Sequence, residues 1–186
     1  VYKGVNMNFR FGKRFNRYNN IVNNTKNTND NNSMDYAIGL NYWSDTWFNF
    51  YFQINAVNNQ STSTIRPNIT TNYWSYSSYG NFNFKFKKAK TYLSFENEFN
   101  IYQKSVAFPD QRNIYIVSPS IRKVIGKKDL FEIKLYAFDL FNQNSNVSRN
   151  ISSNFISETT NNSIRRYFLF GVIYNFSKNS KPPSFD

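Results

Sequence analysis

The chain has 186 residues, a formal net charge of +12 and a mean hydropathy of −0.65, yet 20% of its residues are aromatic. It contains no Cys and no His, which excludes disulfides, the usual zinc and iron–sulfur sites, and catalysis by Cys–His or Ser–His pairs. We therefore expect a protein that is not an enzyme and that holds no metal or cofactor. No stretch approaches the roughly 18 apolar residues of a membrane helix, and the apolar residues recur with a period of two, which is typical of strands.

The positive charge is spread along the chain. Lys85 and Lys87 alternate with Phe side chains, and Arg122 and Lys123 lie near the end of an expected strand. A nucleic-acid-binding protein usually clusters its Lys and Arg residues on one face. We therefore expect no nucleic-acid partner, and instead a basic lining and rim that meet anionic groups.

In chain order, the first expected strands are 1–11 and 15–26, joined by a tight turn near Gly12. An Asn-rich loop up to Ser33 follows, and then a strand over 34–43 and a tight turn at Ser44 to Thr46. The next strand, 46–59, alternates sharply: Phe48, Phe50 and Phe52 share one face, and polar residues occupy the other.

After a long polar loop up to Asn72, a strand is expected over 71–87 and another over 91–107, with a tight connection at Lys87 to Lys90. A loop up to Asn113 leads to the strand 113–125 and to a tight turn at Gly126 to Asp129. The strand 129–147 then has Ile133 and Leu135 on its apolar face. A long loop up to Ser163 precedes the last strand, 164–177.

Tight and long connectors alternate along this list. An antiparallel meander with short turns at one edge and long loops at the other is typical of outer-membrane barrels. The sequence thus predicts an all-β transmembrane antiparallel β-barrel segment of about nine strands, with residues 1–177 in the barrel portion and 178–186 in a tail. A soluble sandwich or a solenoid is the alternative, but the long strands and their aromatic faces favour lipid. The residues expected to face lipid are Phe48, Phe50, Phe52, Phe82, Phe84, Phe86, Phe95, Phe99, Ile133 and Leu135.

The number of expected strands also predicts where the chain begins. If the tight turns lie in the periplasm, nine strands ending there would make the first strand start on the opposite side. Because single-chain bacterial barrels have both termini inside, at least one further strand would then have to precede Val1.

The C-terminal part carries a family resemblance. From Leu130 to Ser152 an amphipathic strand leads into an Asp-Leu-x-Asn-Gln-Asn kink at Asp139 to Asn144, and then into Ser148 and Arg149. After a loop, Arg166, Tyr167 and Phe168 begin the last strand. In the order and spacing of these elements the chain resembles the C-terminal end of the TonB-dependent-receptor-like outer membrane β-barrel family of Bacteroidetes.

The resemblance implies a large barrel of about 22 strands that is closed by a plug domain. It further implies substrate uptake across the outer membrane, driven by a TonB-type energy coupler through a plug that is not in this sequence. The resemblance also implies that the barrel-assembly machinery recognises the final strand. The segment "YNF" at Tyr174 to Phe176 is similar to the aromatic-x-aromatic signal that this machinery binds. The closing-strand residues are Phe168, Phe170, Val172, Tyr174 and Phe176.

The expected partners are therefore outer membrane lipid, the barrel-assembly machinery and the energy coupler. The expected location is the outer membrane of a Gram-negative bacterium, with the C-terminus in the periplasm. Two alternatives stay open: a non-transporting outer-membrane barrel with a structural or assembly role, and a secreted β-rich adhesin. The sequence assigns no substrate-binding residue.

Overall fold

The structure, a computed structural model, describes residues 4–44, 47–68, 70–104, 112–126, 129–145, 147–151, 156–174 and 176. None of these residues is helical, and the all-β prediction is confirmed. The strands are β1 (Gly4–Val22), β2 (Thr25–Trp43), β3 (Phe48–Ser63), β4 (Thr71–Phe86), β5 (Thr91–Tyr102), β6 (Arg112–Ile125), β7 (Phe131–Phe138), β8 (Val147–Ile151), β9 (Ile156–Thr160) and β10 (Tyr167–Tyr174).

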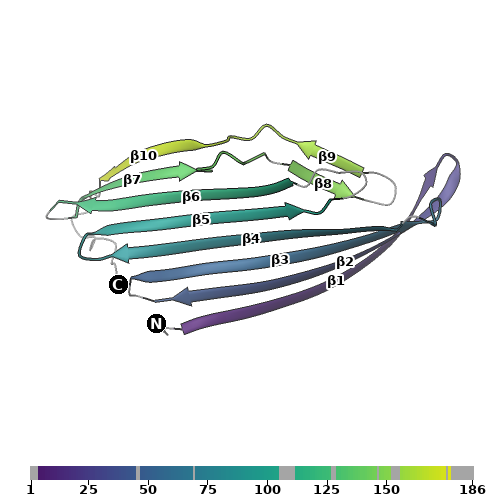
Figure 1. Ribbon diagram of the computed structural model, residues 1–186, viewed down its shortest axis with the longest axis horizontal. Coiled ribbons are helices and arrows are strands. Elements are labelled where there is room, and N and C mark those ends of the chain that lie inside the picture. Colours follow the sequence, from purple (N-terminus) through teal and green to yellow (C-terminus); the bar gives the residue numbers. More distant parts are fainter. Residues whose placement is uncertain are drawn as a thin grey trace.

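Eight of the strands form one antiparallel sheet in the order β1-β2-β3-β4-β5-β6-β7-β10, and β8 pairs with β9 in a separate small sheet (Figure 1). Each strand of the large sheet pairs with its neighbour in the chain until β7, which pairs with β10. Within the described ranges, β1 and β10 pair on one side only. The sheet is therefore an open meander.

The two ends of the strands differ, as the sequence predicts. One end, the tight-turn end, carries the short connections β2–β3, β4–β5 and β6–β7. The opposite end, the loop end, carries the longer connections β3–β4, β5–β6 and β7–β10, and also the two-residue β1–β2 turn at the tip of a projecting hairpin (Figure 1). Gly4 pairs with Trp43 and Tyr174 pairs with Phe131, so the first and last strands both have their outer termini at the tight-turn end. The prediction that the first strand starts at the loop end is wrong.

The error comes from the first 43 residues. Gly12 does not form a turn: it lies opposite Asp35 inside an unbroken register that runs from Gly4↔Trp43 to Val22↔Thr25. The turn is at Asn23 and Asn24, whose φ angles of 48° and 63° suit the left-handed turns of hairpins, and Asn tolerates this conformation well. The predicted strands 1–11 and 15–26 are thus mostly one strand, and most of the predicted loop up to Ser33 belongs to β2.

Other boundaries differ less. β3 extends to Ser63, so the loop before Thr71 is shorter than predicted. β7 ends at Phe138 instead of continuing to 147, and the predicted loop up to Ser163 contains β8 and β9. The tail 178–186 and the connection 105–111 lie outside the described residues.

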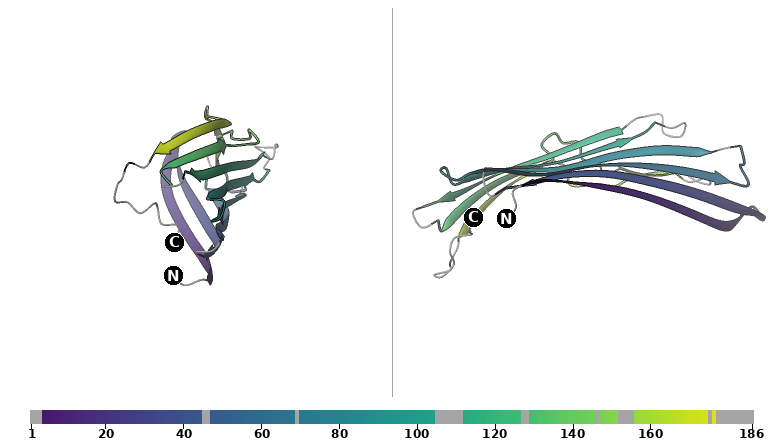
Figure 2. Two further views of the ribbon diagram at one scale, coloured as in Figure 1. Left: turned by 90° about the vertical axis from the view of Figure 1, so that its left-hand side faces the viewer. Right: turned by 90° about the horizontal axis from the view of Figure 1, so that it is seen from below.

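The sheet is bent into a trough, which Figure 2 shows in two further views. Side chains alternate between its two faces, an apolar face and a polar face. The polar face lies inside the bend, because one pocket of about 410 Å³ is lined by its side chains from β3 through β10. Side chains of six neighbouring strands converge on this pocket, which indicates that the polar face is the concave one.

No second layer covers the apolar face among the described residues. The buried apolar residues are few, namely Ala37, Tyr73, Ile114, Val124 and Ala137, whereas Phe9, Phe168 and Phe170 are 70%, 67% and 66% exposed. A soluble sheet would bury such side chains against another layer. This sheet therefore has an amphipathic composition without a hydrophobic core of its own.

Candidate functional site

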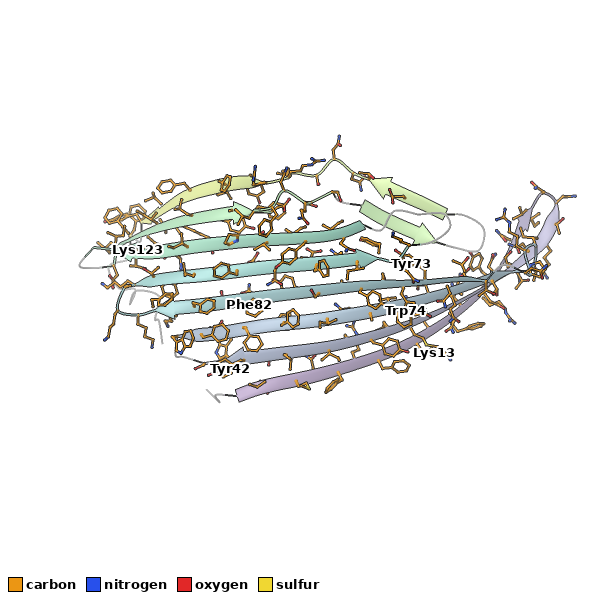
Figure 3. All side chains as sticks on the ribbon, viewed as in Figure 1. Lys13, Tyr42, Tyr73, Trp74, Phe82 and Lys123 are labelled. Carbon is orange, nitrogen blue, oxygen red and sulfur yellow. The ribbon has the colours of Figure 1, made fainter. Side chains whose placement is uncertain are left out.

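The apolar face is built by cross-strand pairing. Phe48, Phe84, Leu93, Ile121, Leu135 and Phe170 lie opposite one another in an unbroken row across β3, β4, β5, β6, β7 and β10. The next row towards the loop end starts with Val5 and Tyr42 and continues through Phe50, Phe82 and Phe95. Figure 3 labels Tyr42 and Phe82 of this row. Side chains of one face therefore form continuous apolar rows.

Aromatic rings in these rows contact one another across the strands. The ring centroids of Phe48 and Phe84 are 4.9 Å apart, those of Phe50 and Phe82 are 5.9 Å apart, and those of Phe131 and Tyr174 are 4.7 Å apart. Such pairs contribute about 0.5–1.5 kcal/mol each beyond the burial of their surface. The rings thus support the sheet although one side of each remains open.

All the residues that the sequence predicts to face lipid lie on this face. They are Phe48, Phe50, Phe52, Phe82, Phe84, Phe86, Phe95, Phe99, Ile133 and Leu135, together with Phe168, Phe170, Val172 and Tyr174 of β10. Phe176 lies beyond the end of β10 and is 86% exposed, with its ring 4.6 Å from that of Tyr174. Their contact with lipid stays a prediction.

Sequence reasoning missed the part of this face that β1 and β2 contribute. Val5, Met7, Phe9 and Phe11 pair with Tyr42, Leu40, Ile38 and Tyr36. The signal was present, since apolar residues occupy every second position of both segments, with Ala37 and Trp43 as the additional apolar residues on the other face of β2.

The apolar side chains form a band that crosses the rows obliquely. In β3 they run from Phe48, nearest the tight-turn end, to Ala56, beyond which Asn58 donates a hydrogen bond of 2.6 Å to Asn72 of β4. In β10 they run from Tyr174 to Phe168. In β3, the row that contains Phe48 and Phe170 is therefore the apolar row nearest the tight-turn end. In β10, the same row lies near the loop-end limit of the band. From β3 to β10, the tight-turn limit and the loop-end limit of the band both shift towards the tight-turn end by about one residue per strand.

Asn97 is a polar exception in the middle of the band. It lies opposite Gly80, and a Cβ atom added at Gly80 would be 2.9 Å from Nδ2 of Asn97 and 2.9 Å from Cε2 of Phe82. The amide therefore folds over the bare glycine backbone beside an aromatic ring. The missing side chain at position 80 accommodates the polar group.

Among the described residues of the apolar band, two lysines lie on the apolar face, and both are near the limits of the band. Lys123 of β6 lies between Ile121 and Ile125 near the tight-turn end, opposite Thr91 and Ile133. Lys13 of β1 follows Phe11 near the loop-end limit. Figure 3 shows the two lysines towards opposite ends of the sheet.

The polar face carries ladders of amide and hydroxyl groups. The Gln53 amide donates to Asn55 at 2.6 Å, Asn55 donates to Ser77 at 3.3 Å, and Asn100 donates to Glu98 at 2.8 Å. The groups named here bond to one another, whereas Asn41 Oδ1 and Ser61 Oγ on the same face are buried without a hydrogen-bond partner among the described residues. The amide and hydroxyl composition of the face suits contact with water.

The pocket on the polar face combines charges of both signs. Lys85, Arg122 and Lys134 line it together with Glu96 and Glu132. The Arg122 guanidinium lies 3.5 Å from the buried Glu132 carboxylate and 4.4 Å from the Tyr92 ring centroid. Arg122 and Lys134 are directly opposite each other, an arrangement of like charges that destabilises a sheet unless other groups or solvent offset it.

The kink after β7 forms a polar clasp between distant segments. Asp139 is fully buried and has a φ of 47°; its two carboxylate oxygens accept hydrogen bonds from the backbone N–H groups of Gln143 (3.0 Å) and Asn144 (2.8 Å). The Asn142 side chain accepts from the N–H of Arg166, and the Asn144 amide donates to the carbonyl of Ile164. The motif thus ends β7 and fixes the approach to β10.

A second polar cluster fixes the projecting end of the β1–β2 hairpin. Asn27 and Asn29 are fully buried, and the Asn27 amide contacts Asn20, Asn29 and the hydroxyl of Ser63 at 2.7–3.1 Å. Further towards the sheet, Arg17 binds Asp30 with N–O distances of 2.6 and 2.9 Å, and this hydrogen-bonded guanidinium lowers the pKa of Asp30.

Among the described residues, no helix is long and apolar enough to cross a membrane. In the same ranges, no three His, Cys, Asp or Glu side chains gather closely enough to hold a metal ion. Comparisons with protein-family models, with curated proteins and with solved structures found no match.

Proposed function

We propose that this sheet is a wall segment of an outer-membrane β-barrel, with hydrocarbon covering its apolar face and water its polar face. The observation that carries the proposal is the exposure of a continuous aromatic and aliphatic face on a sheet whose other face is concave and polar. Soluble monomers rarely expose a contiguous apolar surface of more than a few hundred Å².

The dimensions of the apolar band support a membrane in preference to a second protein layer. From Phe48 to Ala56 the band measures about 26 Å along β3 at the usual rise of about 3.3 Å per residue. Its shift of about one residue per strand corresponds to a tilt of about 35°, since neighbouring strands are about 4.8 Å apart. The band is then about 22 Å high, close to the apolar belt of about 25 Å in outer-membrane barrels.

The lysines on the apolar face fit the same arrangement. A charge in the middle of a bilayer is unfavourable, whereas a long lysine side chain near its edge extends its ammonium into the headgroup layer. Lys123 and Lys13 lie near opposite limits of the band. The positions of these two lysines therefore support a membrane whose headgroup levels lie near both limits of the band.

The lengths of the connections support one orientation of the sheet in the membrane. Periplasmic turns of outer-membrane barrels are short and their outer loops are long. The tight-turn end would therefore lie in the periplasm, together with the outer termini of β1 and β10, and the β1–β2 hairpin would project outside the cell. In the described ranges β1 and β10 each have one free edge, and closing a barrel would require these edges to pair with each other or with other strands.

The transport role rests on the family resemblance. The Asp139 to Asn144 motif and the Arg166 to Phe168 segment, which carry that resemblance, form one hydrogen-bonded unit that holds the last strand. On this basis we infer a TonB-dependent receptor or transporter whose plug domain would couple it to the energy-transducing partner, and whose final strand would be recognised by the barrel-assembly machinery.

Fractionation of cells that produce the complete protein tests the barrel. We expect the protein in the outer membrane, with a folded form whose electrophoretic migration changes on heating. A protein that is recovered folded from the periplasm without detergent would contradict the proposal. Cross-linking to the TonB-type coupler tests transport separately, because an inserted barrel that forms no cross-link would indicate a non-transporting role.

A further inference from the structure

A hollow on the apolar face lies next to Lys123. Its volume is about 400 Å³, and its lining includes Phe95, Pro119, Ile121, Ala137 and Phe168. Pro119 and Ala137 are small, whereas the Phe side chains on either side of them are large. The β6–β7 register ends at Ser120↔Tyr136, beside Pro119, which has no N–H group to donate to a neighbouring strand. The sequence therefore creates a local depression in an otherwise bulky surface.

Lys123 stands at the tight-turn side of this hollow. It is exposed, and Ile121, two residues away on the same face, lines the hollow. Its neighbours across the strands are Thr91 and Ile133, neither of which is charged. Among the described residues, no carboxylate oxygen lies within 4.0 Å of its ammonium group. Within the part of the chain that the structure describes, a cation without a carboxylate counter-ion thus lies two residues from an apolar depression.

Further positive charge lies in the adjoining turn. The backbone N–H of Val124 donates to the carbonyl of Lys90 at 3.0 Å, which brings the β4–β5 turn beside Lys123. Lys87 and Lys88 of that turn are exposed, whereas Lys90 is paired with Asp129. The surroundings of Lys123 are therefore positive overall and favour an anionic partner.

We propose that this surface is a binding site for one acidic phospholipid of the periplasmic leaflet. The lipid phosphate contacts the Lys123 ammonium, and one acyl chain fills the hollow between Pro119, Ala137 and Phe168. A phosphate and an acyl chain on one molecule match a cation near the tight-turn limit of the apolar band and a hollow that begins one row further towards the loop end, at Ile121. This inference rests on the proposed function, because it needs the apolar face to lie in a bilayer.

Electron paramagnetic resonance of spin-labelled lipids tests the site. The complete protein is reconstituted into phosphatidylcholine vesicles that contain chain-labelled phosphatidylglycerol or chain-labelled phosphatidylcholine, and the motionally restricted fraction of each label is measured. We expect roughly five-fold stronger association of phosphatidylglycerol, the effect of about one basic residue near a membrane surface. Lys123→Gln should remove most of this preference.

Lys134→Gln is the matched control, because Lys134 lies in the neighbouring strand but on the polar face. It should leave the preference intact. Ala137→Phe, which fills the hollow, should lower the restricted fraction of phosphatidylglycerol, whereas Ala56→Phe, elsewhere on the same face, should not. The site is overturned if the unmodified protein shows no preference, if Lys123→Gln retains it, if both lysine variants lose it equally, or if Ala137→Phe has no effect. A protein that does not enter the vesicles would instead contradict the proposed function.

Discussion

Phe82 and Asn83 are neighbours in β4 whose side chains lie on opposite faces of the sheet. Phe82 stacks on Phe50 in the apolar band, and Asn83 belongs to the polar face. If hydrocarbon covers the apolar face, the two positions should respond very differently to the same charge.

We predict that Phe82→Arg lowers the stability of the inserted protein by about 2–4 kcal/mol, the range for a basic residue near the middle of a bilayer. Asn83→Arg should change it little, because water solvates that side. Urea unfolding in lipid vesicles, followed by heat-modifiable migration, measures both variants. Equal losses at the two positions would contradict the assignment of the faces.

At the scale of elements, the clasp around Asp139 determines how the chain passes from β7 to β10. Asp139→Ala would remove the acceptors for two backbone N–H groups, and an unsatisfied buried polar group costs about 1–3 kcal/mol. We predict faster proteolysis between residues 139 and 166 while β1 to β6 stay protected. Asn162→Ala, at an exposed position in the same segment, is the control and should not increase cleavage. Unchanged cleavage of the Asp139 variant would show that the clasp is not needed.

The Asn27 cluster acts in the same way on the β1–β2 hairpin. Asn27→Ala removes the hydrogen bonds to Asn20, Asn29 and Ser63. We expect faster amide hydrogen exchange at the hairpin end, around residues 18–30, with no change near the tight-turn end. Asn16→Ala, in an exposed part of β1, should have no such effect. Protection that survives in the Asn27 variant would contradict a role for this cluster.

These elements also show how far the sequence predicts the structure. Alternation of aromatic and polar residues predicts β3 to β5 well, because it directly reflects two different environments. It fails in β2, where Thr25 to Asn32 contain no apolar residue and read as a loop. There the strand is held by pairing with β1 and by the buried amides of Asn27 and Asn29, which hydrophobic periodicity does not detect.

The apolar face was likewise predictable in part from the sequence. The residues predicted to face lipid in β3 to β7 and β10 could be identified from alternation, because the pattern within one strand is enough to separate the residues of its two faces. The oblique course of the band could not, since it depends on the register between strands. Lys123 also reads as an ordinary strand-end charge until the register sets it between Thr91 and Ile133 on the apolar face.

At the scale of the whole molecule, the decisive features of the part that the structure describes are two free edges and one uncovered apolar face. β1 is 19 residues long, contains no Pro and pairs with β2 without a bulge, so nothing prevents its free edge from pairing with another strand. We predict that a polypeptide of these 186 residues self-associates in water and disperses only in detergent, as measured by light scattering and sedimentation. Monodisperse behaviour without detergent would indicate that protein covers the apolar face.

The central claim is that hydrocarbon covers the apolar face, and collision measurements on spin-labelled side chains test it most directly. The 186 residues contain no Cys, so Phe84→Cys and Asn83→Cys can each be labelled in the complete protein, in a background without other reactive cysteines. In lipid vesicles, the label at position 84 should be accessible to oxygen and shielded from a water-soluble nickel complex, and the label at position 83 should show the reverse. A label at position 84 that is shielded from both reagents would mean that protein, and not lipid, covers this face.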